Sequence, residues 1–304
     1  IDMIENAGSG YPGISLSAAP ILYTLYSRHL NISINDTSWI SRDRVVLSAG
    51  HGAALLYATL FMGGFDLTIN DLKNFRRAGS KTPGYPDFKL TPGVDLTTGP
   101  FGQGLSSAGG MALSQKMLKN RYFFPKKSVI ELETALLDYN IYVLCSAGDL
   151  MEGIGYEAAS FAGINNLNNL IVLYDSNNSN IDGNDKNVFN EGLGERFKSL
   201  GWNYEFVKNG NNVNEIDKAI KKSRNSSKPT LIEIRTIIGY GLPGQGTNEI
   251  YDGVPSKEAI YSLKKSLGTS EKEPFYYSES AKKEFTKMVS ERGSQKYALW
   301  SNNY

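Results

Sequence analysis

Short apolar runs recur along the chain, separated by stretches in which apolar residues return at helical spacing. Continuous apolar runs at Ile141–Cys145, Leu170–Tyr174 and Thr230–Ile234 are typical of strands buried on both faces of a sheet. Two shorter segments, Arg44–Ser48 and Tyr204–Val207, also predict strands. The segments expected to be helical are Ile14–Leu30, Gly52–Met62, Leu105–Leu118, Glu152–Ala162, Leu193–Leu200 and Val213–Ile220. This alternation predicts an α/β fold, a doubly wound parallel sheet with helices on both faces.

One stretch fits neither pattern. Ser80–Gly102 holds four glycines and four prolines, which predicts a long ordered loop. A loop of this length in a compact domain is usually functional. After Ser256 the chain becomes helical and charged, so we expect one domain over residues 1–255 and a helical tail or linker over 256–304.

Composition narrows the classes of function. With 32 basic and 31 acidic residues the net charge is +1, which disfavours nucleic acid as a partner. No apolar run approaches about 18 residues, so no membrane span is expected. A single cysteine, Cys145, excludes an internal disulfide and is expected to be an inert core thiol. No segment resembles a signal peptide, and we expect a cytoplasmic protein. His29, on a predicted helix, is expected at the surface.

Candidate chemistry follows two of the strands. Residues 146–153 (SAGDLMEG) come directly after Cys145, and residues 175–183 (DSNNSNIDG) come directly after Tyr174. Ligands of parallel sheets bind beyond the carboxyl ends of the strands, so the two loops could converge on one ligand. Free backbone N–H groups suit a phosphate, and Asp or Asn oxygens suit Mg²⁺. The same residue types are also ordinary turn residues, and the residues alone leave that alternative open.

The two loops resemble a motif of the transketolase family. CSAGDLMEG followed by LIVLYDSNNSNIDG resembles the family's thiamine diphosphate motif, which has a GDG turn and a later Asn. Further segments resemble the family in the same order, from Asp2 to about Pro255 and more weakly beyond. They are DMIENAGSGYPG, RDRVVLSAGHGAALLYA, DLKNFRRAGSKTPGYP, TPGVDLTTGPFGQG, KPTLIEIRTIIGYG and QGTN.

The resemblance implies a thiamine diphosphate-binding fold and the family's N-terminal, diphosphate-side domain. It implies thiamine diphosphate and Mg²⁺ as cofactors and phosphosugars as substrates. The reaction it implies is transfer of a two-carbon ketol unit in the pentose phosphate pathway. The implied partner is a dimer mate or a pyrimidine-type domain, which this sequence does not contain. We therefore expect a fragment or one subunit of a split protein, with a complete processed chain as the alternative, and we expect the chain alone to be inactive.

Several site residues follow from the resemblance position by position. Asn177 matches the metal-binding Asn, and Ser179 stands where a backbone carbonyl binds the metal. His51 and Glu152 match an active-site histidine and the acidic residue after the GDG turn, and we assign them as catalytic candidates. The implied cofactor contacts are Gly99, Phe101, Gly148 and Asn177. Arg76 and Arg77 could meet a substrate phosphate or could be ordinary surface residues.

Other positions depart from the family pattern. Ala147 replaces the metal-binding Asp of the GDG turn, so the metal site is doubtful. Four positions that are histidines in the family carry other residues here: Tyr11, Tyr85, Asn248 and, across a one-residue insertion, Asp252. Tyrosine is a poor base near neutral pH, and asparagine does not exchange protons usefully.

Two interpretations of the chain remain open at this stage. The first is part of a transketolase-like transferase, with Asp149 as a possible substitute metal ligand. The second is a degenerate paralogue that has lost cofactor binding and acts as a structural or regulatory partner. An altered sugar transferase that still depends on thiamine diphosphate is a further alternative. For each of them we expect the helices Leu105–Leu118 and Glu152–Ala162 to form a dimer or partner interface.

Overall fold

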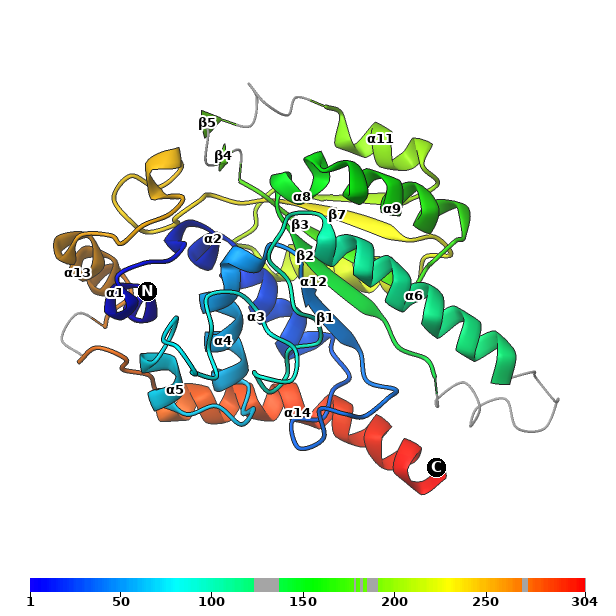
Figure 1. Ribbon diagram of the computed structural model, residues 1–304, viewed down its shortest axis with the longest axis horizontal. Coiled ribbons are helices and arrows are strands. Elements are labelled where there is room, and N and C mark those ends of the chain that lie inside the picture. The colour runs from blue at the N-terminus through cyan, green and yellow to red at the C-terminus, as the bar shows by residue number, and fades with distance from the viewer. Residues whose placement is uncertain (123–136, 178, 181–182, 185–190, 270–272, 304) are drawn as a thin grey trace.

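The computed structural model describes residues 1–122, 137–177, 179–180, 183–184, 191–269 and 273–303, with the backbone alone at 179–180 and 183–184. Its centre is a five-stranded parallel sheet with the strand order β1-β2-β3-β7-β6 (Figure 1). The five strands are β1 (Arg44–Leu47), β2 (Ile141–Cys145), β3 (Leu170–Ser176), β7 (Thr230–Arg235) and β6 (Asn203–Val207). A separate antiparallel pair joins β4 (Ser179–Asn180) and β5 (Gly183–Asn184).

Helices cover both faces of the sheet, which confirms the predicted doubly wound α/β fold. One face is covered by α3 and α12, with α4 and α14 packed beside α3, and the other by α6 and α9. The described helices are α1 (Asp2–Ala7), α2 (Pro12–Ser17), α3 (Ala19–Arg28), α4 (Ala53–Met62), α5 (Ile69–Lys73), α6 (Gln103–Tyr122), α8 (Ala147–Met151), α9 (Gly153–Ile164), α11 (Leu193–Ser199), α12 (Val213–Arg224), α13 (Lys257–Ser266) and α14 (Glu279–Asn303). Two short 3₁₀ turns, η1 (Gly50–Gly52) and η2 (Asn248–Ile250), complete the set of described helical elements.

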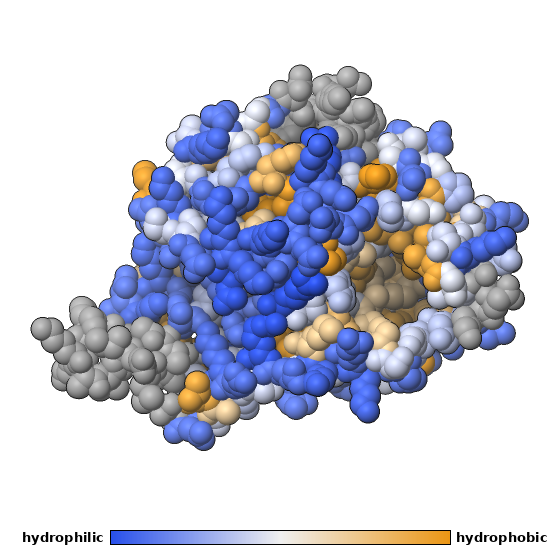
Figure 2. Space-filling model, turned by 180° about the vertical axis from the view of Figure 1, so that it is seen from behind, coloured by the Kyte–Doolittle hydropathy of each residue, from blue (hydrophilic) through white to orange (hydrophobic). Residues whose placement is uncertain are grey.

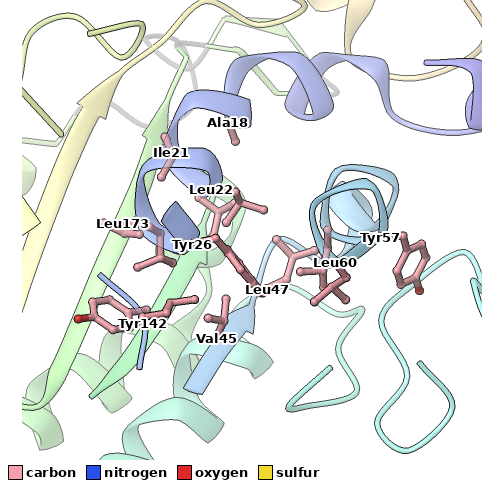
Figure 3. Packing of buried hydrophobic residues seen from close by; sticks show 14 of the residues in the cluster. Ala18, Ile21, Leu22, Tyr26, Val45, Leu47, Tyr57, Leu60, Tyr142 and Leu173 are labelled. Carbon is pink, nitrogen blue, oxygen red and sulfur yellow. The ribbon is translucent and has the colours of Figure 1, made fainter. Parts of the chain in front are cut away.

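Alternate residues of the strands feed two hydrophobic cores. In β2, Tyr142 and Leu144 belong to the core on the α3 side, whereas Val143 and Cys145 belong to the core on the α6 side. Side chains of a strand point alternately to opposite faces, so a strand buried on both faces must be apolar throughout. Figure 3 shows the α3-side core, where Tyr142 and Leu173 from the sheet approach side chains of α3.

The predicted helix Ile14–Leu30 is divided into two, α2 and α3. Ala18 ends α2 and is also the residue before α3, and Pro20 stands in the first turn of α3. A proline lacks the N–H that a continuous helix would need, but it is tolerated in a first turn, so the helix restarts there. Most residues of both helices are buried.

The surface position expected for His29 is wrong. Its side chain is fully buried where α3 ends, because α12 packs across that end of α3. Its Nε2 lies 3.0 Å from Asp217 Oδ1 of α12. Burial lowers the pKa of His29 to about 4. The core position expected for Cys145 is confirmed, and burial raises the pKa of that thiol.

Residues Ser80–Gly102 contain no helix or strand, as the glycines and prolines predict. After Ser256 the chain forms α13 and α14. Phe285 and Val289 of α14 are part of the α3-side core, and Thr286 Oγ1 donates a hydrogen bond to Met62 O. The division of the chain at residue 255 stays a prediction. Among the described residues no helix is both long enough and apolar enough to cross a membrane.

We expect the Leu173→Ala substitution to destabilise the fold by about 2–5 kcal/mol, since it leaves a cavity at a fully buried position of the central strand β3. The measurement is the free energy of unfolding in urea. Leu267, which follows α13 and is 66% exposed, provides the matched control. Leu267→Ala should change the same quantity by less than about 0.5 kcal/mol. Equal effects of the two substitutions would contradict the placement of the core.

Candidate active site

The two loops singled out in the sequence leave adjacent strands at the same edge of the sheet. β2 and β3 pair in parallel with Cys145 opposite Tyr174, so Ala147 and Asn177 both follow strand ends at that edge. The helices α2 and α8 lie at this edge as well (Figure 1). The expected convergence of the two strand ends is therefore confirmed by the sheet register.

The carboxylate of Asp149 accepts hydrogen bonds from three segments of the chain at this edge. Oδ1 accepts hydrogen bonds from Ser48 Oγ at 2.6 Å and from Gly102 N at 2.9 Å. Oδ2 accepts from Ser146 N and Ser146 Oγ at 2.9 and 3.1 Å, which forms a capping box at the start of α8. Burial raises the pKa of Asp149, while these hydrogen bonds act in the opposite direction. Both carboxylate oxygens of Asp149, the possible substitute metal ligand, thus already accept hydrogen bonds from the protein.

A second buried carboxylate, Asp175, organises the loop after β3. Asp175 Oδ2 accepts hydrogen bonds from Ser17 Oγ at 2.7 Å and from Asn177 Nδ2 at 2.9 Å. Thr236 Oγ1, just beyond β7, donates to Asp175 Oδ1. The Asn177 amide is consequently oriented by Asp175 at the end of the same strand, β3, which holds its nitrogen toward that carboxylate.

His51 lies at the centre of an aromatic cluster. Its ring stacks on Tyr251 at a centroid distance of 5.6 Å and meets the edges or faces of Tyr11 and Phe101 at 5.2 and 5.6 Å. Burial lowers the pKa of His51 to about 4, so the imidazole is neutral at pH 7. A neutral imidazole offers one donor and one acceptor, and it neither attracts nor repels a phosphate by charge.

Two of the residues that stand in place of family histidines contact each other. The hydroxyls of Tyr11 and Tyr85 lie 3.2 Å apart in a hydrogen bond. That bond is the main cause that raises the pKa of Tyr11, so the hydroxyl is protonated near neutral pH. The guanidinium of Arg76 stands 5.9 Å from the centre of the Tyr11 ring, which brings one positive charge to the rim of the cluster.

The predicted cofactor loop lies against the turn after β2. A Cβ atom added to Gly148 would lie 3.0 Å from the Phe101 ring, so only glycine allows this approach without displacing the ring. Gly99 is half-buried beside Tyr85. Glu152 is exposed where α9 begins, and a Cβ on Gly102 would come within 3.0 Å of its Cβ. The structure thus brings His51, Phe101, Gly148 and Tyr11 together, with Glu152 at the outer margin.

The position at which the resemblance implies a metal-binding Asp is apolar. Ala147 is the first residue of α8, only 4% exposed and part of the α6-side core. Ser179 lies in β4, opposite Asn184. Within the ranges that the structure describes, no three His, Cys, Asp or Glu side chains are grouped closely enough to hold a metal ion. The described residues therefore fit the organic part of a cofactor better than its cation.

The loop after β7 closes the site from one side. Gly239 N donates to Gly13 O at 3.0 Å, and Gly253 N donates to Gly10 O at 2.9 Å. These bonds hold the loop against the segment that carries Tyr11. Asn248 and Asp252 are both exposed on this loop, outside the aromatic cluster, whereas Tyr251 points into it.

Four residues of the site escaped the sequence-based prediction: Ser48, Tyr251, Ser17 and Thr236. Ser48 and Thr236 carried a usable signal, because Ser48 is the last residue of one predicted strand and Thr236 comes just after another, both at the carboxyl edge. Ser17 and Tyr251 carried none, since a buried helix and a loop give no information about which side chain will face a distant strand end.

We expect the free energy of unfolding to decrease more steeply on lowering the pH when His51 is present than when it is replaced. Its folded-state pKa is depressed to about 4 from an ordinary 6.5, so the stabilisation is full above pH 6.5 and is lost as the pH falls toward 4. Between pH 7 and pH 4.5 the loss should be about 2–3 kcal/mol.

The measurement is the free energy of unfolding of the wild type and of His51→Phe across this pH range. His29 is present in both proteins and cancels in the difference. Parallel pH profiles for the two proteins would show that the His51 ring is not desolvated in the fold.

Comparison with known proteins agrees with the family resemblance of the sequence motifs. The family model described as "Transketolase, thiamine diphosphate binding domain" matches residues 1–304. The chain is 44% identical over 306 residues to a transketolase of Bacillus subtilis, covering all of this chain and 45% of that protein. The chain therefore spans less than half the length of the curated relatives it matches.

Solved structures agree in fold over almost the whole chain. A transketolase from Campylobacter jejuni superposes with a TM-score of 0.92 at 39% identity, covering 99% of this chain and 46% of that one. A transketolase from Pichia stipitis in complex with sedoheptulose-7-phosphate gives a TM-score of 0.92 at 36% identity, with 99% and 44% covered. By family match, identity and fold, the chain belongs to the thiamine diphosphate binding domain family of transketolases.

Proposed function

We propose that this chain supplies the diphosphate side of a thiamine diphosphate site in a transketolase-like transferase. Joined to a pyrimidine-type portion, the protein would transfer a two-carbon ketol unit between phosphosugars. The observation that carries the proposal is the meeting of the Gly99–Phe101 loop with the Gly148 turn, beside Asn177 on the next strand. The family match over the full chain supports the same assignment.

The residues at this edge suit the organic cofactor in three ways. The turn through Gly148 leaves backbone N–H groups at the start of α8, which suit a phosphate. Phe101 and the neutral His51 ring form an apolar wall, and Gly99 leaves space beside Tyr85. When bound, thiamine diphosphate would supply the nucleophilic carbon that attacks the donor carbonyl, and the protein would supply orientation and electrostatics.

A phosphosugar substrate would approach from the side of Tyr11 and Tyr85. Their paired hydroxyls can donate to or accept from sugar hydroxyls, and Arg76 offers a positive charge to a phosphate. The Pichia stipitis relative was solved in complex with a phosphosugar, which supports this class of substrate. Because the pKa of Tyr11 is raised, its hydroxyl stays protonated near neutral pH, and it positions a substrate and does not act as a base.

Ala147 favours a second candidate function, that of a non-catalytic partner. A carboxylate that faces Mg²⁺ in a partly dry site contributes several kcal/mol to the binding of the cation, because it offers a full charge where a neutral group offers only a dipole. Here that position holds a methyl group in the core, and Asp149 is occupied by its own hydrogen bonds. On this second proposal the fold and its interface persist, while cofactor binding is weak or lost.

The Ala147→Asp substitution separates these two functions. If the missing carboxylate limits binding, Ala147→Asp should tighten the binding of thiamine diphosphate with Mg²⁺ at least about tenfold, or roughly 1.4 kcal/mol. The measurement is a calorimetric titration of both proteins, each with the pyrimidine-type portion present, followed by an assay of ketol transfer. Wild-type activity at micromolar cofactor would favour the enzyme.

Ala147→Asn is the matched control, because it adds nearly the same volume without the charge. It should leave the affinity within about threefold of the wild type, since a neutral dipole replaces little of a full charge. If the wild type already binds at micromolar concentration and neither substitution changes it, the argument for degeneracy fails.

The helices α6 and α9 form the proposed partner surface. They pack against each other and leave large apolar side chains exposed, among them Met117, Ile154, Phe161 and Ile164, the last at 81%. Exposed apolar side chains grouped on one face are typical of a protein interface. The match covers only 45% of the Bacillus subtilis relative. This supports a partner at the surface of α6 and α9, either a second copy of the chain or a pyrimidine-type domain.

We expect Phe161→Asp to weaken this association at least about tenfold, because it places a charge within an apolar contact. Sedimentation velocity over a range of concentrations measures the effect. Leu267→Asp, at an exposed apolar site away from α9, is the control and should leave the sedimentation unchanged. A chain that stays monomeric with every partner portion present would contradict the proposed surface.

A further inference from the structure

A polar cavity lies at the opposite edge of the sheet, where β2 and β3 begin. Its volume is about 580 Å³, which is within the range of small-molecule sites. Asn140 and Asn169, the residues directly before β2 and β3, form its floor. The C-terminal parts of α6 and α12 form its walls. Asn140 and Ala147 are seven positions apart on either side of β2, or roughly 20 Å along the strand direction.

Positive charge dominates the lining of this cavity. Lys116 and Lys119 come from α6, and Lys221 and Arg224 come from α12, against a single lining carboxylate, Asp138. The protein as a whole carries a net charge of only +1, so this is a local excess. Hydrophilic residues also gather across the middle of the face seen from behind (Figure 2).

The pairing of these cations leaves room for an anion. Lys119 forms an exposed ion pair with Asp138 at 2.8 Å, which contributes little, and Lys221 pairs at 2.7 Å with Asp217, whose carboxylate is mostly buried. Within the described ranges the Arg224 guanidinium forms no hydrogen bond or ion pair, although its charge acts on the buried Asp43 carboxyl. Its guanidinium is therefore available to a phosphate, whose geometry it matches.

The cations that remain are held near the cavity by other contacts. Lys116 Nζ donates to Asn165 O at 2.6 Å, so its charge is fixed in place. Another carboxylate, that of Asp43, lies next to the floor of the cavity and accepts a hydrogen bond from Asn140 N at 2.7 Å. Lys296 of α14 donates to Asp138 O and adds a further positive charge at the rim. The field within the cavity thus favours an anion.

A second, independent feature points to what else the ligand must offer. Asn169 is 8% exposed, and its Nδ2 donates to Gln115 Oε1 at 3.0 Å and to Ala112 O at 3.2 Å. Its Oδ1 is buried and accepts no hydrogen bond in the described structure. This oxygen has almost no accessible surface, so a ligand does not reach it, but the amide side chains of Asn140 and Asn168 also line the cavity and can pair with hydroxyl groups.

We infer that this cavity binds a small organic phosphate that also carries hydroxyl groups. The phosphate would sit among Lys119, Lys221 and Arg224, and hydroxyl groups would pair with the amides of Asn140 and Asn168. The site lies at the amino edge of the sheet and uses none of the residues assigned to the cofactor. It would therefore bind its ligand whether or not the carboxyl edge holds thiamine diphosphate.

Calorimetric titration with ribose 5-phosphate tests the inference, on the protein with its pyrimidine-type portion present and without thiamine diphosphate. The cavity variant is Lys119→Gln with Arg224→Gln. The matched control is Lys218→Gln with Lys222→Gln, which removes the same charge from α12 at residues outside the cavity lining. We expect the cavity variant to weaken binding at least tenfold and the control to weaken it less than twofold.

Three results would overturn the inference. The wild type could fail to bind at millimolar ligand, or both double variants could weaken binding equally, which indicates only long-range charge. The loss could instead appear in Arg76→Gln and not in the cavity variant, which would place the ligand at the carboxyl edge.

Inorganic phosphate and free ribose distinguish the two parts of the ligand. Inorganic phosphate should bind at least fivefold more weakly than ribose 5-phosphate, and ribose should not bind measurably. Equal affinities for inorganic phosphate and ribose 5-phosphate would overturn the role of the lining amides, because the hydroxyls would then add nothing.

Discussion

Three segments that are distant in the sequence meet at the buried carboxylate of Asp149, and the arrangement of the candidate site depends on that meeting. Ser48 belongs to the end of β1, Gly102 to the start of α6, and Ser146 to the turn after β2. Losing this carboxylate would leave buried donors unsatisfied, at about 1–3 kcal/mol each. It follows that Asp149 cannot turn toward a cation without loosening the loops that define the site.

The acidic residues at the carboxyl edge are engaged in structure more than in metal binding. Asp175 joins Ser17 and Thr236 just as Asp149 joins its three segments. Each carboxylate gathers hydroxyl and backbone donors from different elements, and this fixes the strand ends relative to the helices. With Ala147 in the core, the described residues leave the amide of Asn177 as the main polar group at the proposed metal position.

The two edges of the sheet have opposite character. The carboxyl edge is aromatic around the neutral His51, with Arg76 at its rim and the carboxylates of Asp149 and Asp175 engaged in hydrogen bonds. The amino edge has a cluster of cations over buried amides. All strands of a parallel sheet run in the same direction. The loops that follow the strands therefore gather at one edge of the sheet, and the helix ends that precede the strands gather at the other. One fold can thus offer two ligand environments without a change in its core.

The sequence by itself determined the sheet, its parallel direction and the edge at which the candidate site lies. Apolar runs and helical spacing are local properties of the chain, and the strands they predict agree with the structure to within one residue at the carboxyl ends of β1 and β2. The order of motifs also determined the family. Only the tertiary structure decided where single side chains point.

His29 is the clearest example. A histidine on a helix is ordinarily exposed, but α12 lies across this one and buries it, and no local pattern records that contact. Tyr251 stacks on His51 although 200 residues separate them. The cations of the amino-edge cavity come from α6 and α12, which are distant in sequence. Such contacts depend on which helix packs on which strand, and that is set by the whole core and not by any one segment.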